Sequence, residues 1–564
     1  MRTFVIILTV LFLAGPLWAA SPVPAPPAKL ADFAQVDIFA DAAVGALNEG
    51  CLVRGHGWLC RENWPDLGRR GRSYLAGLEV SRLAWSPLAL QFTPRRSGTL
   101  TVTLDSPWEE QSPGVIYRQD VCFDAVSATG ASLTNGSFEM LVGRAPAGWE
   151  RVGAPVPVSR SDPAPFEGRR YVIVWTGSTL RQTLAVTGGI PVTLSFQARA
   201  RTPAGYVAMP PLRSRNTPAY RAARQFMRGV NLSHYLEAPA GEDWGQRYTT
   251  DDFARIKSEG FDHVRIPCAW QNHTDPAPDY TISNAFFAVV DALVAGAVTN
   301  GLNAIVDIHN FYAFSSDPAS NSAEFYGLWE QIARHYSNAP PGVAFELLNE
   351  PLVAAPGLMN PINAEAIRRI RALQPRRTIF VGCANANDVN ALEALRLPED
   401  DNLIVTIHDY EPFPFTHQGA DWAGWSVATT NVVYPGPPET PLEPDAFVAS
   451  QTRTRAWFDG YNRLERACNP SGRAAFEDRL RYVRLWSDTY GRPVYVGEWG
   501  CYMAADPASR ARFHADKQAV LDELGLGWAL WDWKANFGYW DESFDRPRPG
   551  LREALFPRKD APRP

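Results

Sequence analysis

From residue 226 to residue 556, short apolar runs alternate with helix-length amphipathic segments. The eight runs are FMRGVNL, HVRIPCAW, NAIVDIHN, VAFELLNEP, TIFVGCAN, LIVTIHDY, PVYVGEWG and GWALWDW. Parallel strands need a crossover helix between them, so this rhythm predicts eight βα units closed into a (β/α)8 barrel. One intervening segment, TTDDFARIKSEG, begins with Thr and Asp and stops at Gly, as an α-helix should.

The 564 residues are too many for one ordinary core, and residues 31–204 have a different pattern. Residues 98–106 (GTLTVTLDS) and 190–200 (IPVTLSFQARA) alternate apolar and polar side chains, as half-buried strands do. VCFDAVSATG and RRYVIVWTG add further strands between Gly-rich turns. We therefore predict an α/β chain, in which an all-β jelly-roll-like sandwich precedes a TIM barrel.

The remaining segments are predicted to be targeting and connecting sequence. Residues 1–20 combine Arg2, an apolar stretch at 4–13 and small residues at Ala19 and Ala20, which is typical of a secretory signal peptide. The apolar stretch is too short for a comfortable membrane span. Residues 21–30 form a Pro-rich spacer and residues 205–225 an irregular linker. We expect a secreted or periplasmic protein with no membrane association once the signal peptide is removed.

Composition narrows the class of partner. The net charge is −6 and no basic stripe is present, which argues against a nucleic-acid partner. Aromatic residues make up 12% of the chain, with 19 Trp, and suit stacking on sugar rings as well as core packing. Among the seven Cys, Cys51 and Cys60 could pair, but the sequence leaves the connectivity open. We expect a monomer.

Polar side chains end most of the eight apolar runs. In a (β/α)8 barrel the carboxyl ends of the strands meet on one face, where the chemistry of such folds is built. Burying unpaired polar groups is costly, so this many at equivalent positions are predicted to form a site. The candidates are Arg265, His309, Asn349, Glu350, His408, Tyr410, Glu498 and Trp531.

Two of these candidates, Glu350 and Glu498, are carboxylates at the ends of buried-looking strands. Paired carboxylates without metal-ligand spacing are typical of glycoside hydrolysis, in which one acid protonates the leaving oxygen and the other attacks or activates water. Neither HExxH, a P-loop nor GxSxG occurs in the chain. We therefore expect no metal at the site and no cofactor requirement for catalysis.

The C-terminal region resembles glycoside hydrolase family five, within the clan A (β/α)8 enzymes whose catalytic Glu residues lie on strands four and seven. NEP around Glu350 is characteristic of the clan, and HDYEPFPFTHQGA is similar to the sixth-strand segment of cellulase-like bacterial members. The resemblance covers residues 226–556 and includes all eight signature positions. One departure is Trp499, where Phe is common.

This resemblance implies a role for each candidate. Glu350 would be the general acid/base and Glu498 the nucleophile. Asn349 would bind the sugar 2-hydroxyl, Tyr410 would steady the nucleophile, and Trp531 would lie under the sugar that is cleaved. The supporting polar shell would consist of Arg265, His309 and His408. The physical chemistry agrees, because an Arg near Glu498 favours its ionised form while an acid must be partly protonated near neutrality.

The N-terminal region has a resemblance of its own. LTNGSFEM, AGWE and QTLAVTGGIPVTLSFQARA resemble segments of carbohydrate-binding modules of the galactose-binding-like jelly-roll type. This implies either a carbohydrate-binding domain or a purely structural sandwich. Such modules also allow a structural Ca²⁺ ion.

The function that best fits these observations is a secreted retaining endo-β-1,4-glucanase, with a β-glucan polysaccharide or oligosaccharide as substrate. A β-mannanase, a glucomannan- or xyloglucan-active enzyme and an exo-acting β-glucosidase would share the mechanism and stay open. A non-catalytic polysaccharide-binding protein is a further alternative. The presence of both Glu residues argues against it.

Overall fold

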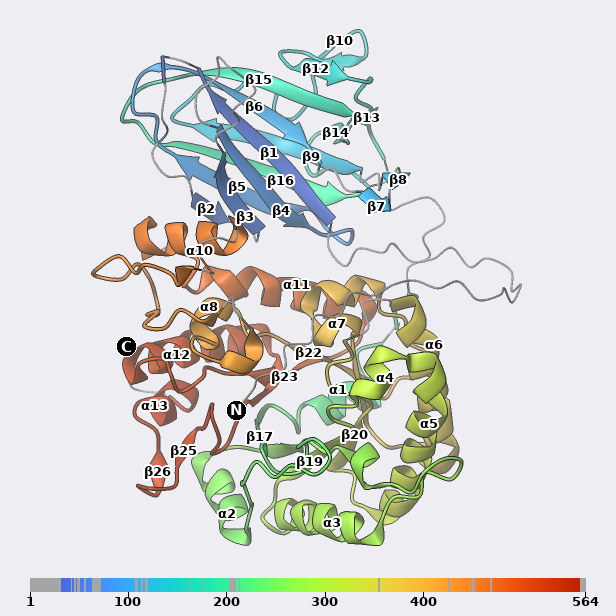
Figure 1. Ribbon diagram of the computed structural model, residues 1–564. Coiled ribbons are helices and arrows are strands. Elements are labelled where there is room, and N and C mark those ends of the chain that lie inside the picture. The colour runs from blue at the N-terminus through green and yellow to red at the C-terminus, as the bar shows by residue number, and fades with distance from the viewer. Residues whose placement is uncertain are drawn as a thin grey trace.

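The structure is a computed structural model that describes residues 32–557, apart from residues 42, 45–46, 48–50, 55–56, 63–72, 107–109, 113–114, 117–119, 162, 176, 202–208, 213, 353–355, 425–426, 447, 449–451 and 467–468. The predicted signal peptide and Pro-rich spacer lie outside the described residues, as do the side chains of Cys51 and Cys60. The described chain forms a β-sandwich and a closed barrel (Figure 1).

The sandwich consists of two antiparallel sheets, each with six strands among the described residues. The first has the order β12 (Glu150–Gly153), β15 (Ser178–Val186), β6 (Gly98–Asp105), β1 (Asp32–Ala40), β4 (Ser73–Val80) and β3 (Gly57–Glu62). The second has the order β13 (Val158–Ser159), β14 (Tyr171–Val174), β9 (Val121–Thr129), β16 (Val192–Ala200), β5 (Ser86–Phe92) and β2 (Cys51–Arg54). Two short hairpins, β7 (Glu110–Ser112) with β8 (Val115–Ile116) and β10 (Leu141–Val142) with β11 (Ala145–Pro146), extend from it.

Alternating side chains build the core of the sandwich. Along β16, buried and partly exposed residues alternate without interruption, and the buried set faces the other sheet. β6, β9, β14 and β16 each fall within a segment that the sequence predicts to be a strand. The predicted all-β N-terminal region is confirmed.

Eight parallel strands close into a barrel, which confirms the predicted (β/α)8 fold. They are β17 (Arg228–Asn231), β18 (His263–Ile266), β19 (Asn303–Asp307), β20 (Val343–Glu346), β21 (Ile379–Gly382), β22 (Leu403–His408), β23 (Val494–Trp499) and β24 (Gly527–Leu530). β24 pairs with β17 to complete the closure. Each strand lies within one of the eight apolar runs, because strands covered on both faces read as continuous apolar sequence.

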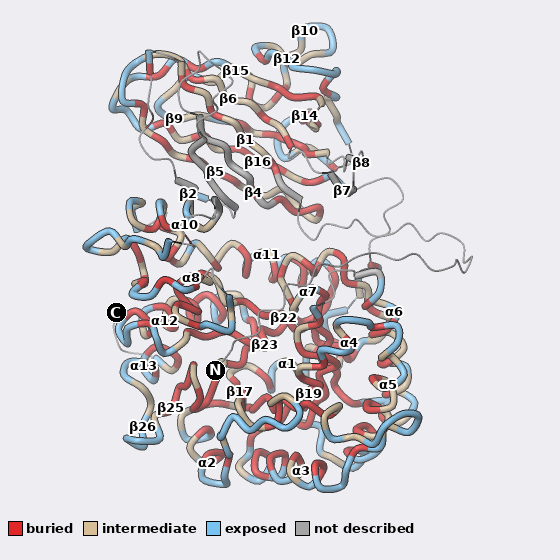
Figure 2. Tube along the Cα trace, in the orientation of Figure 1, coloured by how far each residue is buried: buried red, intermediate tan, exposed pale blue. Residues whose placement is uncertain are grey.

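Helices surround the barrel, and Figure 2 shows buried strands inside and exposed helix faces outside. The longer ones are α2 (Thr250–Glu259), α3 (Asn284–Thr299), α5 (Pro318–His335), α6 (Pro356–Leu373), α11 (Ala474–Tyr490) and α12 (Pro507–Leu524). α2 begins with a capping box between Thr249 and Asp252 and ends at Gly260, whose φ of 108° favours glycine. Among the described helices, none has both the length and the hydropathy to cross a membrane.

Further elements complete the barrel domain. α1 (Pro218–Ala223), within the stretch for which the sequence predicts a linker, packs with Phe226 against the amino end of the barrel. The other described helices are η2 (Trp270–His273), α4 (Tyr312–Ser316), η3 (Tyr336–Asn338), α7 (Ala384–Asn387), η4 (Val389–Ala394), α8 (Phe413–Thr416), η5 (Asp421–Ala423), α10 (Thr452–Arg463) and α13 (Leu551–Leu555). A small hairpin, β25 (Trp540–Asp541) with β26 (Arg546–Pro547), follows the last barrel strand.

The sandwich contacts the barrel on the side of α10 and α11, where β3 lies against α10 (Figure 1). A buried ionic contact joins the two domains. Ser81 Oγ and the backbone N–H of Arg82 each donate to Glu393 Oε1 at 3.0 Å, and Arg82 Nη1 lies 3.5 Å from Glu393 Oε2. The Arg82 and Glu393 side chains are 7% and 12% exposed. Leu83 packs against the barrel core beside them.

Candidate active site

The structure brings all eight sequence-predicted residues together at the carboxyl ends of the barrel strands. Arg265 and Glu498 lie within β18 and β23, and His408 is the last residue of β22. The others follow their strands by one to four residues: His309, Asn349, Glu350, Tyr410 and Trp531. Hydrogen bonds, ion pairs and one ring stack link them into a single cluster.

Glu498 is held by one donor on each carboxylate oxygen. Arg265 Nη1 donates to Oε1 at 2.8 Å and the Tyr410 hydroxyl donates to Oε2 at 3.0 Å. The side chain of Glu498 is 6% exposed. Burial, together with the charge of Glu498, raises the pKa of Tyr410 well above its ordinary value, so Tyr410 is a neutral donor. The carboxylate is therefore fixed in orientation next to a positive charge, as a nucleophile requires.

Glu350 has a different environment. Its side chain is 35% exposed, and its Oε1 lies 2.7 Å from His408 Nδ1. Removal of water by the surrounding protein raises the pKa of Glu350, against the opposing charges of His309 and Arg265. Burial lowers the pKa of His408 to about 4, so this imidazole is neutral near pH 7. The contact is then a hydrogen bond between a neutral ring and a carboxyl group that is able to hold a proton.

The backbone at Glu350 is strained. Its φ of 38° lies in the left-handed region, which is unfavourable for residues with a Cβ. Bonds on both sides maintain this conformation: the Asn349 N–H donates to Ile308 O at 2.8 Å, and the Ala386 N–H donates to Pro351 O at 2.9 Å. The neighbouring strand ends therefore set the direction in which the Glu350 side chain leaves β20.

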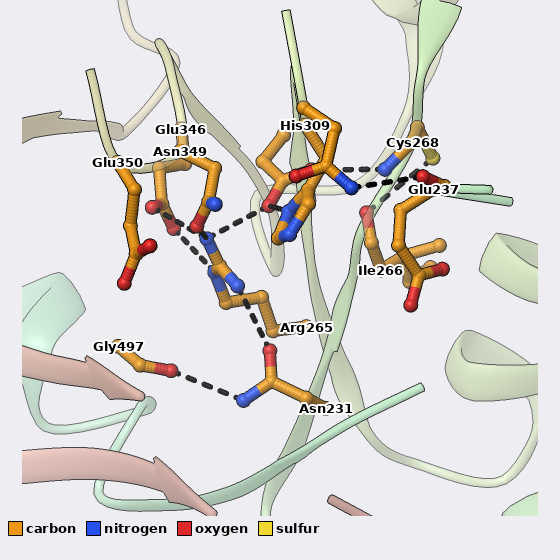
Figure 3. Close-up of polar contacts among 12 residues, drawn as sticks. Asn231, Glu237, Arg265, Ile266, Cys268, His309, Glu346, Asn349, Glu350 and Gly497 are labelled. Atoms are coloured by element: carbon orange, nitrogen blue, oxygen red, sulfur yellow. Dashed lines mark hydrogen bonds and ion pairs between the residues drawn. The ribbon is translucent and has the colours of Figure 1, made fainter. Parts of the chain in front are cut away.

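Arg265 is the centre of the site and is fully buried (Figure 3). It forms a bidentate pair with Glu346, Nε to Oε2 at 2.8 Å and Nη2 to Oε1 at 2.9 Å. It also donates to Asn231 Oδ1 at 3.0 Å and Asn349 Oδ1 at 2.7 Å, and pairs with Asp307 at 2.8 Å. Burial alone would lower the pKa of Arg265, but the carboxylates around it outweigh burial and raise it. The guanidinium is permanently charged and rigidly oriented.

His309 connects this charge network to the aromatic wall of the site. Its Nδ1 lies 3.0 Å from Asp307 Oδ2, and its ring stacks on Trp531 with a centroid distance of 5.8 Å and an interplanar angle of 15°. Burial opposes a charge on His309, but Asp307 outweighs it and the pKa of His309 is raised. His309 therefore stacks on the Trp531 ring while its Nδ1 is held by Asp307.

Four polar residues of the site were missed by the sequence analysis: Asn231, Asp307, Glu346 and Asn387. A signal for Asp307 and Glu346 was available, because each is a charged residue inside an apolar run and a buried charge needs a partner. No such signal marks Asn387. It lies in an irregular turn after β21, and its Nδ2 approaches His408 Nε2 at 3.4 Å.

Among the described residues, one group of side chains that could together hold a metal ion lies at the strand ends, although the sequence shows no metal-ligand spacing there. Glu350, His408 and Glu498 each offer a ligand atom, and these atoms lie within 4.8 Å of one another. The sequence does not reveal this group, because its members come from three different strand ends that lie far apart in the chain. Arg265, Tyr410 and the Glu350–His408 contact already supply hydrogen-bond partners to the group.

Comparison with known proteins agrees with this geometry. Residues 221–537 match the model of the family Cellulase (glycosyl hydrolase family 5). The chain belongs to this family. It is therefore a glycoside hydrolase, and cellulases of family 5 typically need no cofactor for catalysis.

Endoglucanases are among the relatives of this family 5 chain. Endoglucanase H of Acetivibrio thermocellus is 29% identical over 318 residues, which are 56% of this chain and 30% of that protein. Endoglucanase C of the same species is 27% identical over 324 residues, 55% of this chain and 91% of that protein. The solved structure of endoglucanase Cel5A from Thermotoga maritima has 32% identity and a TM-score of 0.52, covering 60% of this chain and 99% of that one.

Proposed function

We propose that the barrel is a retaining endo-β-1,4-glucanase that works by double displacement, with Glu498 as nucleophile and Glu350 as general acid/base. One observation carries the stereochemical part: a carboxylate oxygen of Glu350 and one of Glu498 lie within 4.8 Å of each other. The two carboxyl groups are about 5–5.5 Å apart in retaining enzymes and about 6.5–9.5 Å apart in inverting ones, where water must fit between them. The short separation favours retention.

In the first step a Glu498 oxygen attacks the anomeric carbon while Glu350 transfers its proton to the departing glycosidic oxygen. A glycosyl ester of Glu498 forms and the C–O bond to the leaving sugar breaks. In the second step ionised Glu350 takes a proton from water, and the water oxygen displaces Glu498. Arg265 and Tyr410 hold the Glu498 oxygens in place through both steps.

Asn349 and Trp531 are placed to bind the sugar that is cleaved. Asn349 Oδ1 is occupied by Arg265 Nη2 at 2.7 Å, so its Nδ2 is the group left to donate to a sugar hydroxyl. A hydrogen bond to the 2-hydroxyl that strengthens in the transition state adds to catalysis in glycosidases. The Trp531 ring, backed by His309, offers a flat apolar face for the sugar ring.

A β-1,4-glucan substrate is supported by the endoglucanase names of the relatives. Mannan is the alternative with a specific observation behind it, because structures of T. maritima Cel5A are described with mannotriose as well as cellobiose. Xyloglucan and exo-acting cleavage of short oligosaccharides share the same chemistry and belong in the same test.

The test is a substrate panel with purified protein: carboxymethylcellulose, mixed-linkage β-glucan, xyloglucan and mannan, with a Glu350→Gln/Glu498→Gln double variant as the blank. We expect reducing ends from a soluble β-1,4-glucan, together with an early fall in viscosity that marks internal cleavage. Activity on mannan alone would contradict the proposed substrate. Release of reducing ends without a fall in viscosity would show exo action. If the double variant released as many reducing ends as the wild-type protein, the release would not be due to these two residues.

For the sandwich we propose a structural role. Its outward positions on β6 and β15 include Thr101 and Thr183, which hydrogen-bond across the strands at 3.2 Å, rather than aromatic platforms for sugar rings. Its buried contact with Glu393 instead ties it to the barrel. Binding to insoluble cellulose by the Glu350→Gln/Glu498→Gln protein, compared with binding after addition of a chelator, tests carbohydrate and Ca²⁺ binding together.

Export is also proposed, on the pattern of residues 1–20. Amino-terminal sequencing of protein recovered from the culture fluid and the periplasm tests it. A mature terminus near residue 21 supports export, and a cytoplasmic protein that begins at Met1 contradicts it.

A further inference from the structure

Each ring nitrogen of His408 has a polar side chain beside it. Its Nδ1 lies 2.7 Å from Glu350 Oε1 and its Nε2 lies 3.4 Å from Asn387 Nδ2. Both His408 and Asn387 are buried, the latter completely. A neutral imidazole carries a single N–H, so the two contacts are linked: when one ring nitrogen accepts a hydrogen bond, the other carries the proton and donates.

We propose that Asn387 is a positioning residue that fixes the tautomer of His408, and thereby decides which oxygen of Glu350 carries the acid proton. The Asn387 amide N–H groups face Nε2, which makes Nε2 the acceptor and places the ring proton on Nδ1. This inference rests on the proposed role of Glu350 as general acid.

The chemical consequence follows from the short Nδ1 contact. With the ring proton on Nδ1, His408 donates to Glu350 Oε1, and a protonated Glu350 must carry its own proton on Oε2. That proton is then free to pass to the leaving oxygen. With the other tautomer, the bare Nδ1 would accept the carboxyl proton on Oε1 and hold it away from the substrate. After the transfer, the Nδ1–H stabilises the new carboxylate.

The two ring nitrogens of His408 have different surroundings. On the Nδ1 side, Glu498 Oε2 lies 3.7 Å away, and the charges of Arg265, Glu346 and His309 act on the ring from farther off. On the Nε2 side, β23 presents Gly497, where an added Cβ would lie 3.0 Å from Nε2. Among the described side chains, Asn387 alone is in hydrogen-bonding range of that nitrogen.

The backbone is strained in order to place Asn387 there. Asn385, Ala386 and Asn387 have φ values of 55°, 56° and 57°, three successive left-handed residues of which one is alanine. The turn is tied to the segment after β20 and to the end of β22, since the Ala386 N–H donates to Pro351 O and Asp388 forms a bridge with His408. Gly382 makes room for the amide, because a Cβ at that position would lie 2.1 Å from Asn387 Oδ1. Strain that the surrounding structure maintains in this way is characteristic of functional positions.

The 3.4 Å contact is long for a hydrogen bond. Catalytic hydrogen bonds are often long without substrate and shorten in the Michaelis complex. The orientation of the amide is therefore the decisive feature, and it can be tested by reversing its polarity.

The test replaces Asn387 with Asp, which accepts at both oxygens and therefore draws the ring proton to Nε2. Asn387→Asp should lower kcat on an unactivated cellooligosaccharide by about 10- to 100-fold, a share of the ~10²–10⁴ that general acid catalysis supplies. On 2,4-dinitrophenyl cellobioside, whose leaving group needs no proton, glycosylation should change less than about threefold. A merely structural role would lower both rates in parallel, and that result would overturn the proposal.

The matched control is Asn385→Asp, which makes the same change two residues away at an exposed position of the same turn. It should leave both rates unchanged. Glu350→Ala runs in parallel: if that variant shows no dependence on the leaving group, the proposed acid is wrong, whatever Asn387 does.

A second measurement reads the tautomer of His408 directly in the wild-type protein. ¹⁵N-histidine NMR of the wild-type protein, with the His408 signal assigned by its loss in His408→Asn, reports which ring nitrogen bears the proton. We expect the Nδ1–H tautomer near pH 7. An Nε2–H tautomer for His408 would overturn the proposal.

Discussion

Arg265 and Glu346 face each other through two parallel hydrogen bonds, Nε to Oε2 at 2.8 Å and Nη2 to Oε1 at 2.9 Å, and both side chains are fully buried. A bidentate pair fixes the plane of the guanidinium group. The donors that remain are thereby aimed at four partners: Glu498, Asn349, Asn231 and Asp307. Glu346 therefore orients the guanidinium group of Arg265, and Arg265 in turn holds the carboxylate of Glu498.

Replacing Glu346 with Gln should therefore lower both stability and activity. Removing one partner of a buried ion pair costs about 3–5 kcal/mol, because the other charge loses its compensation. We expect a loss in this range in urea unfolding, and a lower kcat because Arg265 is no longer held in its plane. Glu365→Gln is the control: Glu365 pairs with Arg368 and Arg369 on the surface of α6, where such pairs contribute about 0–1 kcal/mol. Equal effects of the two substitutions would contradict the role of Glu346.

Glu498→Ala and Glu350→Ala should separate the two steps of the reaction. Without Glu498 no glycosyl-enzyme forms, whatever the leaving group. Without Glu350, glycosylation by 2,4-dinitrophenyl cellobioside should continue while hydrolysis of the glycosyl-enzyme slows by about 10²–10⁴. Mass spectrometry of the quenched reaction should then show the trapped sugar on Glu498. External azide should rescue this variant and give the azide of retained configuration, and an inverted azide would show that the roles or the stereochemistry are assigned wrongly.

The raised pKa of Glu350 predicts the alkaline limb of the pH profile. The acid must be protonated for the first step, so the rate on an unactivated substrate falls as the pH rises through the pKa of Glu350, which lies above the ordinary ~4.3 of glutamate. With a dinitrophenyl leaving group this limb should disappear from the first step, because no proton is needed. An alkaline limb of the same position for both substrates would indicate that another group titrates.

Contact with the sandwich should stabilise the barrel. In the full chain, Glu393→Ala removes the acceptor of Ser81 and Arg82, and we expect a loss of about 1–3 kcal/mol, less than for a fully buried pair. A double-mutant cycle with Arg82→Ala isolates the ionic part of this contact. Additive losses would mean that the two side chains do not act on each other.

Chelation should leave the activity unchanged. Although Glu350, His408 and Glu498 lie close enough to hold an ion, the proposed mechanism uses each of them as a protein acid, base or hydrogen-bond donor. Hydrolysis of carboxymethylcellulose after dialysis against EDTA, compared with a mock-dialysed sample, tests this. Loss of activity that a divalent cation restores would assign the cluster a metal.

The barrel could be predicted because its strands are buried on both faces and so read as separate apolar runs, each ending in a polar residue. That pattern placed Arg265 and Glu498 on their strands before any geometry was known. It could not supply the partners of these residues, because pairing across a closed barrel joins positions far apart in the chain. Arg265 and Glu346, for instance, are separated by 81 residues.

Local backbone geometry also could not be predicted from the sequence. The three left-handed residues of the turn that contains Asn387 are not glycines, so no residue pattern indicates this turn. The sequence therefore could not predict that Asn387 lies beside His408. The contact between Arg82 and Glu393, 311 residues apart, is likewise visible only once both domains are folded.

The position of Glu393 has a consequence for modularity. Glu393 lies on η4, in the same connection between β21 and β22 that carries the Asn387 turn. Domains joined by long flexible linkers can be exchanged between enzymes as independent units. If the sandwich were grafted onto another barrel, Ser81 and Arg82 would lose Glu393 as their acceptor unless the β21–β22 connection were transferred as well. The unit of exchange is therefore the sandwich together with the fifth βα connection of the barrel, which reaches the acid side of the catalytic centre.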